Sequence, residues 1–231
     1  MKFGIVTFPG SNCDYDTMHA VVDTLGEKAV YIWHKDRDLQ NADVVVLPGG
    51  FSYGDYLRPG AIARFSPIMH EVVAHARRGA PVLCICNGFQ IACEAGLLPG
   101  ALLRNQTLQF VSSPITMRVE NTRTMFSSAY EPGQLVTMPV AHGDGRYTAD
   151  GRTLDEIEGE GRVVFRYVNR TRDPSAEANP NGAARDIAGI VNDRGNVLGL
   201  MPHPERAMDQ ILGSTDGVGV FESLLGSAAV T

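Results

Sequence analysis

The first half of the chain alternates short apolar runs with segments whose apolar residues recur at helical spacing. The run Val44-Val45-Val46-Leu47 has no polar position, which is typical of a strand in a parallel sheet covered on both faces. Glycines follow the helical segments, as they commonly do. We therefore predict strands over residues 2–8, 28–33, 42–47 and 81–85, and helices over residues 14–26, 61–78 and 88–95.

The second half has a different pattern, in which short strand-like runs are separated by Gly, Asn, Asp or Pro turns. This pattern favours an antiparallel extension of the sheet. The predicted strands cover residues 117–120, 134–140, 163–168, 187–192 and 197–201, and a last helix covers residues 218–225. The fold class is therefore α/β, with an open, mostly parallel, doubly wound sheet and helices on both faces.

Composition limits the class of protein further. The chain has 231 residues, of which 44% are hydrophobic and 20% charged, and this suits a single domain over residues 1–231. A formal net charge of −6 lacks the basic footprint of a nucleic-acid binder. No apolar run approaches the roughly 18 residues of a membrane span, and the N-terminus lacks the features of a signal peptide. We expect a cytoplasmic protein with neither a nucleic-acid nor a membrane partner.

The four cysteines, Cys13, Cys84, Cys86 and Cys93, do not suggest a disulfide framework in a chain of this length and kind. Cys84 and Cys86 lie in an apolar strand without a matching second pair, which is poor spacing for zinc. We therefore expect no metal site. Cys84 and Cys93 are interpreted as small core residues.

Cys86 is different because of what surrounds it. A strand ends at this cysteine, Gly88 follows, and a helical segment begins, which predicts a strand-turn-helix elbow with a thiol at its corner. The N-terminus of that helix favours a thiolate, and the Asn87 N–H is the natural donor to an oxyanion. A second donor is expected from the glycine-rich loop that contains Gly50 and Phe51.

The segment Met201-Pro202-His203-Pro204-Glu205 supplies a histidine and a carboxylate two residues apart. The two prolines favour an extended backbone, in which residues i and i+2 face the same way. Glu205 could then orient His203, which would take the thiol proton and return it to a leaving amine.

The remaining histidines and a glycine-rich stretch give weaker signals. His142 is a candidate site-lining residue, with a plain turn residue as the alternative. The other histidines, His19, His34, His70 and His75, are expected on helix or strand surfaces. Residues 213–219 are rich in glycine, but they do not follow a convincing strand and they lack the Lys-Ser/Thr ending of a phosphate loop.

Several motifs resemble those of class I, triad-type glutamine amidotransferases, which have a flavodoxin-like fold. They are Cys86-Asn87-Gly88-Phe89-Gln90, Leu47-Pro48-Gly49-Gly50-Phe51 and His203-Pro204-Glu205-Arg206. Longer segments, residues 8–14, 49–61, 139–146 and 192–206, more narrowly resemble the glutaminase subunits of phosphoribosylformylglycinamidine synthases. The resemblance covers essentially the whole chain.

The resemblance implies hydrolysis of glutamine to glutamate and ammonia through a thioester on Cys86, with His203 as base and acid and Glu205 as its support. It also implies that Gln90 and the Gly50 loop line the glutamine pocket. A separate synthetase subunit would use ATP and Mg to convert formylglycinamide ribonucleotide to formylglycinamidine ribonucleotide, and a small subunit would bridge the two. No cofactor is expected in this subunit.

Two departures and three alternatives accompany this interpretation. Cys84 stands where the family usually has glycine, and Ser112 and Ser113 replace a common Cys-Arg pair. The alternatives are a cysteine peptidase or deglycase-like hydrolase on a similar elbow, a glutaminase of another biosynthetic pathway, and a catalytically silent regulatory subunit. The polar segment 169–185 and the loop around Arg146 are candidate partner-facing surfaces.

Overall fold

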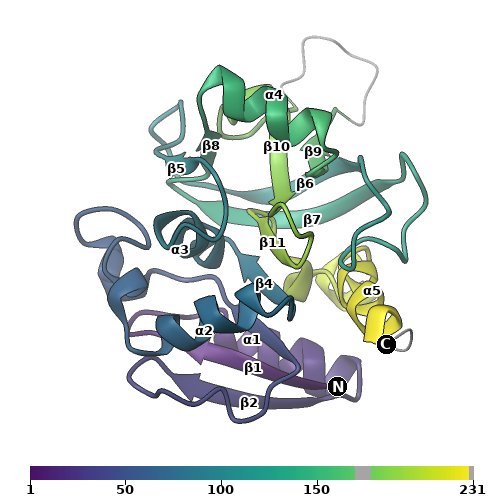
Figure 1. Ribbon diagram of the computed structural model, residues 1–231. Coiled ribbons are helices and arrows are strands. Elements are labelled where there is room, and N and C mark those ends of the chain that lie inside the picture. The colour runs from purple at the N-terminus through teal and green to yellow at the C-terminus, as the bar shows by residue number, and fades with distance from the viewer. Residues whose placement is uncertain (170–177, 229–231) are drawn as a thin grey trace.

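The computed structural model describes residues 1–169 and 178–228, and a nine-stranded sheet runs through it (Figure 1). The strand order is β2-β1-β3-β4-β11-β10-β9-β6-β7. The strands are β1 (Lys2–Thr7), β2 (Lys28–Trp33), β3 (Val44–Leu47), β4 (Val82–Ile85), β6 (Val111–Val119), β7 (Leu135–His142), β9 (Val163–Tyr167), β10 (Ile187–Val191) and β11 (Val197–Leu200). A small second sheet pairs β5 (Ala101–Leu103) with β8 (Arg146–Thr148).

The sheet changes character at β11, as the sequence predicts. Strands β2, β1, β3, β4 and β11 are parallel to one another, whereas β10, β9, β6 and β7 continue the sheet in antiparallel pairs. Every residue of β3 and β4 is buried, because helices cover both faces of the parallel part. The predicted fold class is confirmed.

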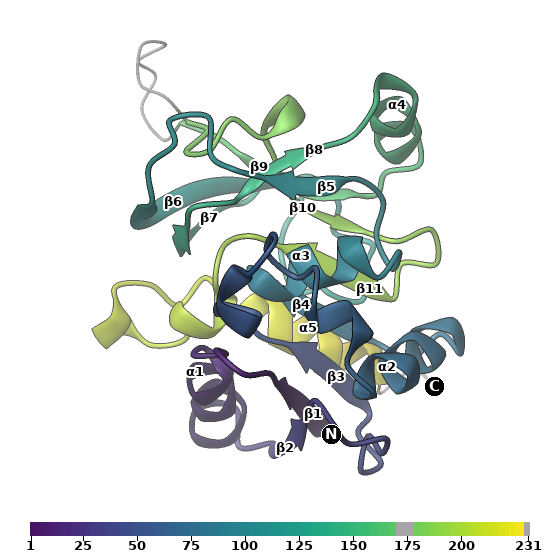
Figure 2. The ribbon, with the colours of Figure 1, turned by 90° about the vertical axis from the view of Figure 1, so that its left-hand side faces the viewer.

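The helices are α1 (Asp14–His19), α2 (Ile68–Arg77), α3 (Asn87–Glu94), α4 (Gly151–Gly159) and α5 (Val218–Ala228). Helices α1 and α2 lie on opposite faces of the parallel strands (Figure 2). Helix α5 packs on the sheet through Phe221, whose ring centroid lies 6.4 Å from that of Phe3 in β1. Among the described residues, every helix is too short or too polar to cross a bilayer.

Some predicted elements have other bounds. The helix predicted over residues 61–78 is wrong as one element, because it divides into a 3₁₀ turn (Ala63–Phe65) and α2. Ser66 between them is extended, with ψ of 140°, since Pro67 disfavours helical geometry at the residue before it. The helix predicted over residues 14–26 is α1 continued by a π-helical turn (Ala20–Thr24).

Other features of the second half went unpredicted or were placed wrongly. Helix α4 and strands β5 and β8 were not predicted, and β6 begins at Val111 rather than Met117. His34 and His75 are buried, with 3% and 5% exposure, so the expectation of surface positions is wrong for these two. His34 Nδ1 lies 2.8 Å from the Tyr53 hydroxyl oxygen, which satisfies that nitrogen inside the protein.

Candidate active site

Cys86 lies at a sharp turn between β4 and α3. Its φ of 51° and ψ of −104° are rare for an L residue, and such strain persists only where the surroundings hold it. The Cys86 N–H donates to Leu200 O of β11 at 2.8 Å. Gly88 lies so close to β3 that a Cβ there would be 1.9 Å from Leu47 O. The backbone therefore forms the elbow that the sequence predicts, and only glycine fits at its second position.

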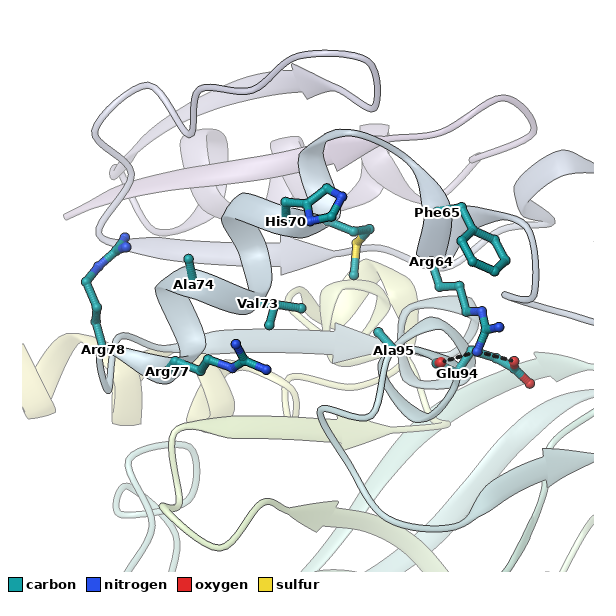
Figure 3. Close-up of a pocket in the computed structure, with 10 residues that line it drawn as sticks. Arg64, Phe65, His70, Val73, Ala74, Arg77, Arg78, Glu94 and Ala95 are labelled. Atoms are coloured by element: carbon teal, nitrogen blue, oxygen red, sulfur yellow. Dashed lines mark hydrogen bonds and ion pairs between the residues drawn. The ribbon is translucent and has the colours of Figure 1, made fainter.

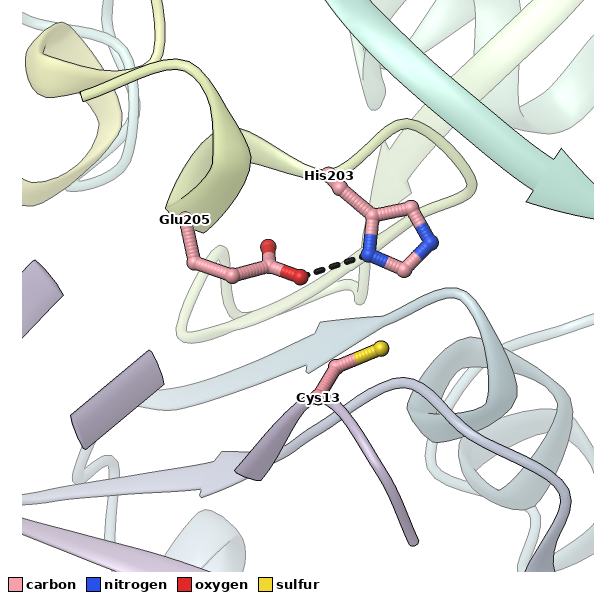
Figure 4. Close-up of side chains that lie close together, drawn as sticks. All are labelled: Cys13, His203 and Glu205. Carbon is pink, nitrogen blue, oxygen red and sulfur yellow. Dashed lines mark hydrogen bonds and ion pairs between the residues drawn. The ribbon is translucent and has the colours of Figure 1, made fainter. Parts of the chain in front are cut away.

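His203 reaches the same edge of the sheet because β11 lies beside β4 in parallel, with Leu200 opposite Ile85. The carboxyl ends of parallel strands meet at one edge, where sites form. The His203 N–H donates to Pro139 O at 2.8 Å, which fixes the backbone after β11. Its Nδ1 lies 2.5 Å from Oε1 of Glu205 (Figure 4). The segment thus orients the imidazole through the carboxylate two residues later, as predicted.

Burial and neighbouring groups set the pKa of His203. Burial by itself lowers the pKa of His203, but the Glu205 carboxylate and the Cys86 and Cys13 thiols together hold that pKa well above its usual value. The Nε2 atom has no hydrogen-bond partner among the described residues. One ring nitrogen is therefore committed to the carboxylate, and the other is available to a thiol or a leaving group.

The elbow also holds the N–H groups predicted to bind an oxyanion. Asn87 is the first residue of α3, and the first N–H groups of a helix have no partner within it. In the neighbouring loop the Phe51 N–H already donates to Gly10 O at 2.9 Å, whereas no hydrogen bond of the described residues engages the Gly50 N–H. Of the two loop residues, the Gly50 N–H is thus the one free to donate, and its contact with an oxyanion, like a contact of Phe51 with substrate, stays a prediction.

Asn87 and Gln90 tie three segments together through their side chains. Asn87 Nδ2 donates to Gln90 Oε1 at 2.8 Å, and its own Oδ1 accepts from the Ser52 N–H at 3.1 Å. Gln90 Nε2 donates to Asp144 O at 2.7 Å. Both ends of the Gln90 amide are thereby engaged with the protein, so its contact with glutamine stays a prediction.

His142 follows a residue that approaches Cys86, but its own ring packs elsewhere. Ala141 O is 3.8 Å from Cys86 Sγ, but the neighbouring His142 ring packs on Gly145, where a Cβ would lie 2.4 Å from Cε1. Its Nε2 lies 3.4 Å from Asn181 Nδ2. Burial, and then the charge of His203, lower the pKa of His142 to about 4. The ring is neutral at physiological pH, and a contact with substrate stays a prediction.

The structure also brings Cys13 to the site, which sequence reasoning missed. Its thiol is buried beside His203 and Glu205, and one possible ligand atom from each of the three lies within 4.8 Å of the others (Figure 4). A signal existed, because the segment after β1 ends at the same sheet edge. Arg206 Nη2 donates to Cys13 Sγ at 3.1 Å and so places a positive charge there, which disfavours a metal ion.

The other described residues noted in the sequence lie in strands or in packed loops of the fold. Cys84 is completely buried, and burial raises the pKa of its thiol well above the usual value. Ser112 and Ser113 lie in β6, opposite Ala141 and Val140 of β7. In the glycine-rich segment 213–219, a Cβ at Gly217 would lie 2.1 Å from Pro204 O. That segment therefore packs against the turn that carries His203. Residues 170–177 of the polar segment lie outside the described residues.

A surface hollow of about 570 Å³ lies elsewhere, between α2 and the end of α3 (Figure 3). Arg64 Nη1 donates to Glu94 O at 3.0 Å at one side of it, and Arg77 lines another part. Its lining contains neither Cys86 nor His203. The hollow is therefore separate from the candidate active site, where the Cys86 residue is only 4% exposed.

Comparison with known proteins defines the class first. The family described as CobB/CobQ-like glutamine amidotransferase domain matches residues 1–216. The chain therefore belongs to the glutamine amidotransferases. A solved structure at low identity, the glutaminase domain of Trypanosoma brucei CTPS, shares the fold and shows the fold alone. Its TM-score is 0.60 and its identity is 12%, over 98% of this chain and 94% of that one.

The particular kind of glutaminase follows from nearer relatives. The chain is 57% identical to the phosphoribosylformylglycinamidine synthase subunit PurQ of Chlorobaculum tepidum, over 98% of this chain and 97% of the relative. It is 56% identical to the PurQ subunit of Nostoc sp., over 97% of each chain. A chain of the PurLQS structure from Thermotoga maritima superposes with a TM-score of 0.88 at 42% identity, over 98% of both chains. The chain thus belongs to the PurQ glutaminase subunits, and the resemblance inferred from its motifs is confirmed.

Proposed function

We propose that Cys86, His203 and Glu205 carry out the glutamine hydrolysis of this PurQ-type subunit. The observation that most supports this proposal is the strained elbow at Cys86, which lies at the same sheet edge as the buried His203–Glu205 pair. Strain of this kind costs about 1–3 kcal/mol, and structures retain it mainly at functional sites. A structural cysteine would gain nothing from such a backbone.

The geometry suggests how the reaction proceeds. His203 takes the proton of the Cys86 thiol, and the sulfur attacks the side-chain amide carbon of glutamine. The Asn87 and Gly50 N–H groups bind the oxyanion, and His203 returns the proton to the leaving nitrogen, so that ammonia departs and a thioester remains. Water, activated by the same imidazole, then releases glutamate and restores the thiol. Glu205 stabilises the imidazolium at each stage.

The supporting machinery is proposed as follows. Residues 1–231 act as one glutamine amidotransferase domain in the cytoplasm, and this subunit uses no cofactor of its own. It assembles with a PurL-type synthetase and a small PurS-type bridging subunit, and these partner names rest on the PurLQS relative. The synthetase uses ATP and Mg to convert formylglycinamide ribonucleotide to formylglycinamidine ribonucleotide with the ammonia released here.

The test is Cys86→Ala in the assembled enzyme. Glutamine-dependent synthesis should be abolished, whereas synthesis driven by added ammonia should continue, since the synthetase site is untouched. Loss of both activities with assembly intact would contradict the proposal. Peptide turnover by the wild type without glutaminase activity in any complex would favour the peptidase alternative. Glutamine hydrolysis stimulated only by another synthetase would assign it to another pathway.

A further inference from the structure

The Cys13 thiol points toward the His203 ring on the side of Cε1, the carbon between the two nitrogens (Figure 4), and one ring nitrogen lies within 4.8 Å of the sulfur. A Cβ built at Gly49 would lie 2.7 Å from His203 Cε1 and 3.0 Å from Cys13 Sγ, so both atoms pack on the same stretch of backbone. Cys13 is 3% exposed and His203 is 1% exposed. The sulfur is therefore one of the buried groups that pack around the imidazole.

Two hydrogen bonds fix this sulfur, and a third holds the arginine that makes one of them. The Cys13 thiol donates to Asn12 Oδ1 at 3.1 Å, and its sulfur accepts from Arg206 Nη2 at 3.1 Å. Arg206 is itself held by Asp16, whose Oδ2 accepts from Arg206 Nε at 2.8 Å. The thiol proton is thus engaged by Asn12, and the sulfur accepts from Arg206 beside the His203 ring.

Cys13 is not a second nucleophile. Burial raises the pKa of its thiol, although His203 and Arg206 partly oppose that rise. A neutral thiol reacts poorly, because the thiolate is the nucleophile. Its backbone also lacks the elbow: the residue has φ of −97° and ψ of 6°, unlike Cys86. The thiol is therefore suited to a supporting role.

We propose that Cys13 is a positioning residue for His203, whose sulfur holds the imidazole toward Cys86 and stabilises its protonated form. This inference rests on the proposed function. When the thiol proton of Cys86 moves to the imidazole, the positive charge is shared by the Cε1–H edge, and the polarisable sulfur lies on that side of the ring (Figure 4). The sulfur also separates this new cation from the Arg206 guanidinium.

The charged and titratable groups around His203 come from several elements. Glu205 is bonded to Nδ1, Cys86 approaches from the elbow, and His142 contributes from the end of β7. Arg206 lies behind the sulfur of Cys13. Cys13 lies on the Cε1 side of the ring (Figure 4) and its thiol is neutral, so its removal changes the support of the ring without changing the net charge of the site.

The experiment compares Cys13→Ala and Cys13→Ser with wild type in the assembled enzyme, with Cys93→Ala as the matched control. Cys93 is a free thiol in α3, remote from His203 in its contacts. Glutamine-dependent kcat and KM are measured across pH, together with ammonia-dependent activity. For Cys13→Ala we expect kcat to fall by up to about tenfold and the basic limb of the pH profile to move about half a pH unit lower. Both effects have the size expected from the loss of one sulfur–aromatic contact.

In the same variant KM for glutamine and the ammonia-dependent rate should stay at wild-type values, and Cys13→Ser should lie between alanine and wild type. A basic limb and kcat identical to those of Cys93→Ala would overturn the proposal. If the alanine variant does not assemble, the serine variant decides in the same way. Should Cys86→Ala retain glutaminase activity, the proposed function itself fails, and this outcome is distinct from a failure of the Cys13 role.

Discussion

Substituting Gly49 with alanine adds one methyl group directly against the His203 imidazole. Gly49 has a backbone conformation that alanine can adopt, so only steric contacts oppose the substitution. The new Cβ would lie 2.7 Å from His203 Cε1 and 3.0 Å from Cys13 Sγ, whereas favourable contacts lie near 3.5–4.0 Å. Restoring ordinary contacts requires the His203 ring to shift by about 1 Å although Glu205 holds its Nδ1.

A displacement of this size costs on the order of 10²-fold in rate when it misplaces a reacting group. We therefore expect Gly49→Ala to lower glutamine-dependent kcat by about 10²-fold, with a loss of about 1–3 kcal/mol in stability from overpacking. The assay measures glutamine-dependent and ammonia-dependent synthesis by the assembled enzyme, and thermal unfolding of the isolated chain. Gly159→Ala in α4 is the control, since nothing lies within 4 Å of its Cβ position. Wild-type glutamine turnover in Gly49→Ala would refute the reasoning, because it would mean that the added methyl group does not displace His203.

Three further predictions test the carboxylate, the core and a half-buried acid. Glu205→Gln removes the charge that opposes the effect of burial on the pKa of His203. Glutamine-dependent kcat should therefore fall by about 10²–10⁴-fold, and the basic limb of its pH profile should move lower. An unmoved limb would count against the pairing of His203 with Glu205. Gly199→Ala in β11 places a Cβ 2.2 Å from Phe89 Cδ2, and urea unfolding should show a loss of about 1–3 kcal/mol, whereas an unchanged midpoint would mean that Phe89 moves freely. Burial, and then a neighbouring carboxylate, raise the pKa of Asp55 from 3.8 to about 6, so its ionisation destabilises the fold as pH rises through that interval. Asp55→Asn should add about 1–2 kcal/mol to the free energy of unfolding at pH 7, after allowance for solvent screening, and almost nothing at pH 3.5; an equal gain at both would exclude this cause.

The predictions from sequence failed where local pattern and tertiary environment disagree. Residues 61–78 carry a helical apolar pattern, yet Pro67 forces Ser66 out of helical geometry and divides the segment. Helix α4 went unpredicted because only Leu154 and Ile157 of its residues are buried, which leaves a weak pattern. Asp150 caps this helix by accepting from the Thr153 N–H at 2.8 Å, and that cap was the available signal.

The sequence by itself determined the parallel half of the sheet, the elbow at Cys86 and the pairing of His203 with Glu205. Each depends on residues close together in the chain, whose periodicity, proline positions and two-residue spacing act locally. Only the tertiary structure decided that β11 inserts beside β4, which brings His203 to Cys86, and that the loop after β1 brings Cys13 to the same ring. These contacts join residues more than a hundred positions apart, and strand order, which fixes them, depends on how all the buried faces pack at once rather than on any local pattern.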